Sequence, residues 1–356
     1  MKFNRTNLSQ ILLPLLSILM AFIIGAIIIL CIGKNPLQAY GFLFKGAFGS
    51  VPSFAETLVK VTPLIFSGLA AVFAYRCGMF NLGAEGQMIM GAVAAVWFCV
   101  AFSYLPGWLN IIVSILLGSI AGALWGAIPG ILKAKGGVNE MIVSILLNYV
   151  ATLFMTYLFS GPLKEAKIPQ TAAVPQVARL AKFLGNTRAH IGIFLALAAA
   201  LLVYYFLFHT YKGYQLRAVG LNPIASKVNG FPVNRFILTA FLVSGGIAGF
   251  GGAVELLGNS MRLQTGFAEG FGFDGVAIAL IGQLHPIGTI LVAYLFAVLR
   301  CGTNTMQINT GISTSVVNII EGIIIIFAVA SSALVQLPEL QQKLNRRMAR
   351  KECSDE

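Results

Sequence analysis

Charged side chains are scarce in this sequence. Of its 356 residues only 10% are charged, 58% are hydrophobic, and the mean hydropathy is +0.85. A soluble domain carries about 25% charged residues, so a chain this apolar could not hide its apolar surface in water. The deficit excludes an ordinary soluble protein and indicates that lipid is part of the solvent.

Acidic residues are scarcer than basic ones. The sequence has 12 Asp and Glu against 24 Lys and Arg, for a formal net charge of +12. In a soluble protein this excess would suggest nucleic acid as a partner. Here the basic residues lie in short loops and at the ends of apolar runs, the pattern that orients a protein in a membrane. We therefore expect membrane lipid, and no nucleic acid, as the partner of these charges.

Several motifs of enzymes and metal proteins are missing. The sequence has no GxxxxGK followed by Ser or Thr, no HExxH and no GxSxG, so it does not bind ATP through a phosphate loop and resembles no hydrolase. The five cysteines show no CxxC spacing, and the three histidines are far apart. We expect no enzyme activity, no metal and no cofactor, so energy for any transport must come from a partner or an ion gradient.

What the sequence has instead is a series of apolar runs. The first begins after Arg5, is long enough to span ~30 Å of hydrocarbon and lacks a clear cleavage site, which favours a retained helix over a signal peptide. The pattern predicts an all-α polytopic membrane protein with about 8–10 transmembrane helices, forming a single transmembrane domain over 1–356. The predicted segments are 11–32, 55–75, 79–102, 108–132, 139–160, 190–208, 236–257, 274–300 and 316–335.

The basic residues predict that both termini are cytoplasmic, with a basic cytoplasmic tail at 338–356. This orientation requires segment 274–300 to cross an even number of times, although it has only 27 residues and His285-Pro286 interrupts it. Two helices of about 13 residues would each reach only ~20 Å. We expect two short helices or a re-entrant hairpin there, in a total of ten segments.

Glycines recur every four residues in 108–132, at Gly118, Gly122, Gly126 and Gly130, and cluster again in 244–252. Small residues on one helix face let two backbones approach closely in lipid. We expect these stripes to serve helix packing.

Polar side chains inside apolar runs need a reason, because an ionised group costs ~2.5–3.5 kcal/mol at the centre of a membrane helix. Asn81 and Glu85 are four residues apart and are expected to share a helix face. A second line of polar residues, preceded by Asn139, consists of Glu140, Ser144, Asn148 and Thr152. Both sets fit either hydrogen-bonded contacts between helices or a polar transport route. Asp274, before an apolar run, is expected to be a helix N-cap.

Several motifs together resemble a known family. GMFNLGAEGQMIMGA (78–92) and GGVNEMIVSILLNYVA (136–151) resemble inner-membrane permeases of ABC importers in the branched-chain amino acid and simple-sugar superfamily, and within it the nucleoside-type branch. Three further segments do the same: LRAVGLNPIASKVNGFPVNRF (216–236), SGGIAGFGGAVE (244–255) and GFGFDGVAIALIGQLHPIGTI (270–290). The resemblance covers most of 11–335.

The resemblance implies a channel-forming subunit of an ATP-driven importer in a bacterial cytoplasmic membrane, most simply for nucleosides. The expected partners are separate ATP-binding cassette ATPase subunits, a second permease that is a paralogue, and an extracytoplasmic binding protein or lipoprotein. It also places the ATPase contact in a cytoplasmic coupling loop at about 210–235. The residues expected to couple to the ATPase are Arg217, Asn222, Pro223 and Lys227, and those expected along the substrate route are Asn81, Glu85, Asn139, Glu140 and Asn148. Simple sugars or another small solute, an ion-coupled secondary transporter and a membrane scaffold remain alternatives.

Overall fold

Helices form nearly all of the regular structure in the part of the chain that can be described. The computed structural model describes residues 5–165, 168–268 and 270–336, so the basic tail expected at 338–356 lies outside the described residues. Seven described helices are long and apolar enough to cross a bilayer, or eight if one bent pair counts as a span. The prediction of an all-α polytopic membrane protein is confirmed.

The chain divides into two compact units, 46–301 and 1–45 with 302–356. In the smaller unit, α1 (Arg5–Cys31) packs against α13 (Thr314–Gln336). The helix α2 (Pro36–Phe48), which the hydropathy pattern did not predict, follows α1 at an angle of 119°. Its apolar stretch is too short to span a membrane alone, which explains why a window of membrane length missed it.

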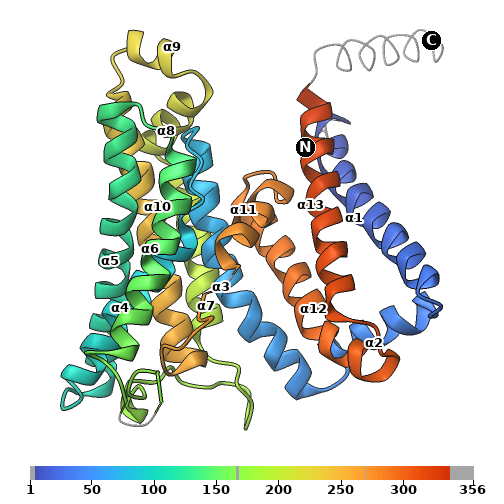
Figure 1. Ribbon diagram of the computed structural model, residues 1–356. Helices are drawn as coiled ribbons and strands as arrows, with labels where there is room; N and C mark the ends of the chain where they lie inside the picture. The colour runs from blue at the N-terminus through green and yellow to red at the C-terminus, as the bar shows by residue number, and fades with distance from the viewer. Residues whose placement is uncertain (1–4, 166–167, 269, 337–356) are drawn as a thin grey trace, which may run out of the picture. The chain divides into compact units, whose positions relative to one another are not determined.

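The larger unit contains the remaining helices, shown in Figure 1. They are α3 (Val51–Arg76), α4 (Ala84–Ala101), α5 (Gly107–Gly136), α6 (Glu140–Ser160), α7 (Gly192–His209), α8 (Tyr211–Leu221), α9 (Pro223–Val228), α10 (Val233–Glu255), α11 (Phe271–Ile281) and α12 (Pro286–Thr310), which continues into the smaller unit. The central helix is α3, since 89% of its most apolar window is buried. A helix that is apolar on all sides takes such a place.

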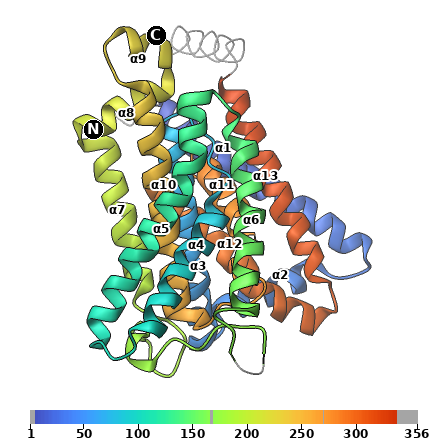
Figure 2. The same ribbon diagram turned by 60° about the vertical axis from the view of Figure 1, so that its left-hand side comes forward.

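The glycine stripes bring α5 and α10 together, and α10 lies beside α5 in both views (Figures 1 and 2). A Cβ added at Gly122 would lie 2.4 Å from the carbonyl oxygen of Gly245, and one added at Gly249 would lie 2.4 Å from that of Gly118. Real Cβ atoms do not come so close to a carbonyl oxygen. The two backbones are therefore in direct contact, and the packing role predicted for the stripes is confirmed.

The interrupted segment after α10, where we expected two short helices or a re-entrant hairpin, forms one short helix and one long helix. One turn of π-helix, Leu256–Ser260, ends α10. Residues 261–268 then contain no helix, α11 has 11 residues, and α12 follows with 25 residues. The two helices are unequal because α12 does not end with its apolar run but continues through the polar sequence CGTNTMQINT (301–310).

Candidate functional site: a cavity among α4, α6 and α11

A cavity of about 320 Å³ lies among α4, α6, α11 and the irregular segment before α11. This volume is at the lower end of small-molecule sites, which hold roughly 300–1,000 Å³. Because Tyr149 lines the cavity and is 67% exposed, the cavity reaches the surface of the chain. Its lining consists of Glu85, Ile89, Ile145, Asn148, Tyr149, Thr152, Met155, Thr265, Gly266, Phe267, Ala268 and Phe273.

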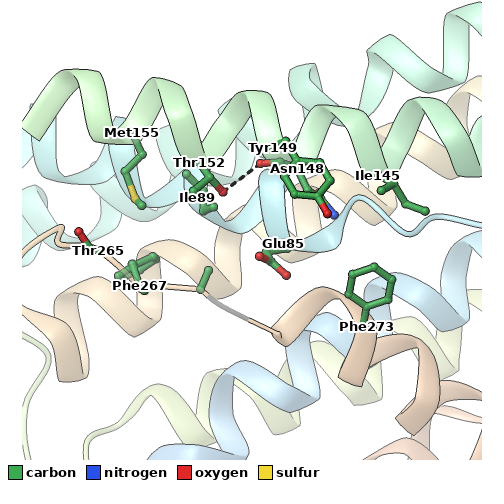
Figure 3. A pocket seen from close by; sticks show the side chains of 12 residues that line it. Glu85, Ile89, Ile145, Asn148, Tyr149, Thr152, Met155, Thr265, Phe267 and Phe273 are labelled. Carbon is green, nitrogen blue, oxygen red and sulfur yellow. Dashed lines mark hydrogen bonds between the residues drawn. The ribbon is translucent and has the colours of Figure 1, made fainter.

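Glu85 occupies the middle of this cavity, between the side chains of α6 and the rings of Phe267 and Phe273 (Figure 3). It lies in the first turn of α4, where the helix dipole favours a negative charge. Its Oε2 accepts a hydrogen bond from the backbone N–H of Gly270 at 3.2 Å. The carboxylate therefore connects α4 to the chain that enters α11.

Asn148 joins α6 to the start of α4. Its Oδ1 accepts from the N–H of Gly86 and its Nδ2 donates to the carbonyl of Leu82, both at 2.9 Å. The first N–H groups of a helix have no partner within the helix, and Asn148 supplies one from a neighbouring helix. It lines the cavity and also holds two helices together, so the two roles that the sequence left open coexist in one side chain.

Asn81 does not share a helix face with Glu85, and that expectation was wrong. The glycine-rich segment before α4 is irregular, and α4 begins only at Ala84 after Gly83. Asn81 is fully buried and donates from Nδ2 to Gln87 at 3.0 Å and to Ser244 at 2.7 Å. It links α4 to α10 and does not line the cavity.

Asn139 and Glu140 lie at the start of α6, away from the cavity lining. Asn139 is the N-cap, and its Oδ1 accepts from the N–H of Met141 at 3.0 Å. Glu140 forms an ion pair of 2.8 Å with Lys133 at the end of α5. The pair connects the ends of two adjacent helices.

The expectation that Asp274 is an N-cap was also wrong. The cap of α11 is Gly270, whose φ of 82° is left-handed and suits glycine. Asp274 lies inside the helix and pairs with Arg300 of α12, whose guanidinium also lies 5.8 Å from the centre of the Phe271 ring. The sequence feature that indicates such a pair is Arg300 itself, because a charged residue in a membrane-length helix needs a partner.

The sequence also gave no indication of Thr265, Phe267 and Phe273 as lining residues. They come from a segment 180 residues away in sequence from the α4 motif, and no periodicity links the two. The resulting cavity combines one carboxylate, two threonine hydroxyls and the faces of aromatic rings. Such a lining suits a small neutral ligand that has hydroxyl groups and a flat ring.

A second feature of interest is the connection from α7 to α10, where the coupling residues were expected. Asn222 is the N-cap of α9, and its Oδ1 accepts from the N–H of Ala225 at 3.0 Å, while Pro223 occupies the first turn. Lys227 lies in the last turn of the same helix. Arg217 is only partly exposed, and its guanidinium lies 5.0 Å from the centre of the Phe208 ring.

The surface formed by the end of α8 and by α9 is apolar as well as basic, which the count of charges did not predict. Leu221, Ile224 and Val228 are 88%, 78% and 84% exposed. These residues belong to α8 and α9, which lie at one end of the larger unit together with the basic ends of α3 and α5 (Figure 1). Large exposed apolar side chains that lie together mark interaction surfaces.

Within the described residues, no group of three or more His, Cys, Asp or Glu side chains is arranged so that it could hold a metal ion. Membrane-length helices with a small, mainly apolar cavity among three of them fit one class of protein, a membrane transport subunit, and the comparisons with known proteins show this class. The family model described as the permease component of the branched-chain amino acid transport system matches residues 53–329. The chain belongs to this family, and the match confirms the resemblance that its motifs indicated. The chain is a transport subunit and not an enzyme.

Three relatives show the range of the family near this chain. It is 39% identical to the guanosine ABC transporter permease protein NupP of Bacillus subtilis over 334 residues, which cover 92% of this chain and 95% of NupP. It is 34% identical to the nucleoside ABC transporter permease protein NupB of Lactococcus lactis, covering 94% and 95% of the two chains. It is 33% identical to the glucose ABC transporter permease protein TsgB13 of Haloferax volcanii, covering 89% and 87%.

The first two relatives occur with a second permease. The same strains have the similar proteins NupQ and NupC, each 30% identical to this chain over 67% and 68% of its length. Each of these two relatives thus has a paralogous permease in the same strain. No solved structure matches this chain significantly.

Proposed function

We propose that this chain is half of the transmembrane channel of an ATP-driven importer for nucleosides, and that the cavity around Glu85 is part of the substrate route. The observation that carries the proposal is the cavity itself, which places a carboxylate, threonine hydroxyls and aromatic rings inside a membrane-spanning bundle. Polar groups at that depth mark a substrate pathway when they face a cavity.

Nucleoside chemistry fits this lining. The ribose hydroxyls can donate to Glu85 and exchange hydrogen bonds with Thr152 and Thr265. The base presents a flat ring for contact with Tyr149 and Phe273, which are 67% and 53% exposed. Few polar groups are present, which suits a route that substrate must leave again.

The remaining residues expected along the route take supporting positions in this proposal. Asn148 forms part of the wall and fixes the first turn of α4. Asn81 joins the start of α4 to α10, Asn139 caps α6, and the ion pair of Glu140 with Lys133 joins α6 to α5. Their loss is expected to weaken the walls of the cavity before it changes selectivity.

The end of the larger unit that carries α8 and α9 is proposed to face the cytoplasm. It gathers the basic ends of α3 and α5 with Lys212, Arg217 and Lys227, as the positive-inside rule requires. The exposed Leu221, Ile224 and Val228 then meet the ATPase subunit. Apolar anchors within a polar rim are the arrangement of protein interfaces. Both termini are proposed to be cytoplasmic as well, in a bacterial cytoplasmic membrane.

The proposed complex needs further subunits. The cavity reaches the surface of the chain at Tyr149 on α6, so a second, paralogous permease is proposed to complete the route there. The opposite end of the larger unit carries the connection 161–191, where an extracytoplasmic binding protein or lipoprotein would deliver substrate. ATP hydrolysis is assigned to the separate ATPase subunits.

A simple sugar is the second candidate substrate, because TsgB13, a glucose permease by its name, is 33% identical to this chain. A sugar would use the carboxylate and hydroxyls of the cavity in the same way. A sugar has no base for the Tyr149 ring to contact. If the substrate is a sugar, this ring should therefore not contribute to the selection among substrates.

A matched pair of tyrosines on α6 tests the proposal. Tyr149 lines the cavity, whereas Tyr157 does not, and the two are similarly exposed at 67% and 64%. In the reconstituted complex, Tyr149→Ala should lower nucleoside uptake about tenfold or change selectivity among nucleosides, since a base contact contributes ~1–3 kcal/mol, and Tyr157→Ala should not.

Complex yield is measured for both variants, together with uptake of guanosine, adenosine, cytidine and glucose. Equal uptake by both variants, or uptake that only follows yield, would remove the cavity from the substrate route. Glucose uptake in preference to every nucleoside would favour the sugar candidate.

A further inference from the structure

A compact cluster of aromatic and basic side chains lies where the ends of α3, α7 and α8 meet. The ring of Phe208, at the end of α7, has the guanidinium of Arg76 at 5.3 Å and that of Arg217 at 5.0 Å from its centre. The ring of His285 lies 5.3 Å from the same ring. Phe208 thus contacts one residue from each of α3 and α8 and one from the connection before α12.

That connection, residues 282–285, is held in an unfavourable backbone conformation. Gln283 and Leu284 have φ values of 55° and 54°, in the left-handed region that side chains with a Cβ rarely adopt. Arg76 donates from Nε to the carbonyl of Leu284 at 2.8 Å and from its terminal nitrogen to that of Gln283 at 3.5 Å. Such conformations persist only where their surroundings enforce them, and here Arg76 supplies that support.

The connection leads directly into the wall of the cavity. It follows α11, and α11 carries Phe273, which lines the cavity. A Cβ added at Gly272 would lie 2.9 Å from the Cβ of Glu85, so α11 packs tightly on the α4 turn that carries the carboxylate. A shift of α11 would therefore move Phe273 against Glu85.

On its other side the cluster is attached to the proposed docking surface. Arg217 belongs to α8, which leads through Asn222 to α9. A Cβ added at Gly220 would lie 2.3 Å from the carbonyl oxygen of Arg76, so the end of α8 also presses on the end of α3. A single residue, Asn222, separates α8 from α9, so α9 lies next in the chain to the helix end that contacts Arg76.

The cluster is not an ordinary ion-paired contact. Within the described residues neither Arg76 nor Arg217 forms a salt bridge with a carboxylate, and the buried Nε of Arg217 has no hydrogen-bond partner. Two cations share one ring, although like charges repel. Among the residues that the structure describes, the cluster therefore lacks the ion pairs and the hydrogen bond that would hold these side chains in one arrangement, as an element with two arrangements would.

We infer that Phe208, with Arg76 and Arg217, positions the 282–285 connection and so couples movement of α8 and α9 to the cavity wall at Phe273 and Glu85. This inference rests on the proposed docking of the ATPase at α9. Phe208 and Arg76 touch neither substrate nor the docking surface in this scheme, Arg217 connects them to that surface, and all three act through the connection and α11.

The test uses the complete transporter in proteoliposomes, with uptake, ATP hydrolysis and complex yield measured for each variant. Phe208→Ala and Arg76→Lys should leave the ATPase bound and hydrolysing while uptake falls about tenfold, within the range of coupling energies in proteins. Lys keeps the charge of Arg76 but cannot both stack on a ring and donate through a planar fork. Phe208→Tyr, which keeps the ring, should restore uptake.

A matched control comes from the same end of the molecule. Tyr205→Ala removes a ring of α7 that contacts His209 and not the cluster. This variant should retain normal uptake.

A second readout separates coupling from stability. In a background without the native cysteines, Phe273→Cys is labelled by a thiol reagent with and without ATP. The labelling rate should change with ATP when Phe208 is present and should not respond when it is Ala.

The outcomes distinguish the inference from the proposed function. If the otherwise unchanged transporter shows no ATP-driven nucleoside uptake, the proposed function fails. If it does, but Phe208→Ala transports normally, or uptake only follows complex yield while Phe273→Cys still responds to ATP, the coupling inference is overturned.

Discussion

Replacing Gly249 by Ala should weaken the helix bundle, whereas the same change at Gly246 should not. A Cβ at position 249 would lie 2.4 Å from the carbonyl oxygen of Gly118 and 2.8 Å from the Cα of Gly122. Both obstacles are backbone atoms of α5, which cannot rotate away as a side chain can. A Cβ at position 246 would find the Oγ of Ser119 at 3.4 Å and the Cβ of Ala123 at 3.6 Å, which are ordinary contacts.

The magnitude follows from two opposing effects. Overpacking a well-filled interface costs typically 1–3 kcal/mol, and more where the backbone must shift. Exchanging Gly for Ala within a helix returns up to about 1 kcal/mol. We expect a net loss of about 2 kcal/mol in the free energy of unfolding for Gly249→Ala, and between no change and a gain of about 1 kcal/mol for Gly246→Ala.

The purified complex, unfolded by heat or by increasing sodium dodecyl sulfate, provides the measurement, and the two variants are compared by their midpoints. Because both glycines lie on α10 and both changes add one methyl group, propensity and hydrophobicity cancel in the comparison. Equal midpoints would show that the close approach of α5 and α10 does not hold the bundle, and would refute the reasoning.

Two further predictions concern the ends of the larger unit. Ile224→Asp on α9 places a charge in the proposed apolar contact, so it should abolish co-purification of the ATPase while leaving membrane insertion intact. The control Tyr104→Asp, at another exposed residue, should retain the ATPase. Co-purification that persists in Ile224→Asp would contradict the docking surface. Burial lowers the pKa of His190 from 6.5 to about 4. Between these two pH values the unfolded connection therefore binds a proton that the folded one does not. The free energy of unfolding should fall as the pH drops from 6.5 toward 4, by up to about 3 kcal/mol. Hydrogen exchange of 161–191 measures this loss, and His190→Asn, which can still accept from Gly192, should remove it; an unchanged pH profile in that variant would assign the effect to other groups.

The membrane-length helices could be predicted because apolar length alone decides them. The short elements could not, since their ends depend on contacts with neighbours. Asn81 has helical spacing to Glu85, yet α4 begins after Gly83, where Asn148 of another helix supplies the cap. Asp274 has the local sequence of a cap, yet its partner Arg300 lies on the next helix.

The candidate site shows the same division. Glu85 and Asn148 were predicted because polar groups in apolar runs require an explanation, and both line the cavity. Phe267 and Phe273 carry no such signal, since aromatic residues are common in membrane helices. Only the approach of α11 to α4 makes them part of the lining, and that approach depends on the close contact of Gly272 with Glu85.

The most direct test of the account is uptake of a labelled nucleoside by proteoliposomes that contain this chain, its paralogous permease and the ATPase subunits, with the binding protein supplied outside. The account predicts accumulation of guanosine or another nucleoside that requires ATP hydrolysis and persists when proton and sodium gradients are collapsed. Uptake that follows an ion gradient without ATP, or ATP-driven uptake of sugars with no nucleoside transported, would contradict it.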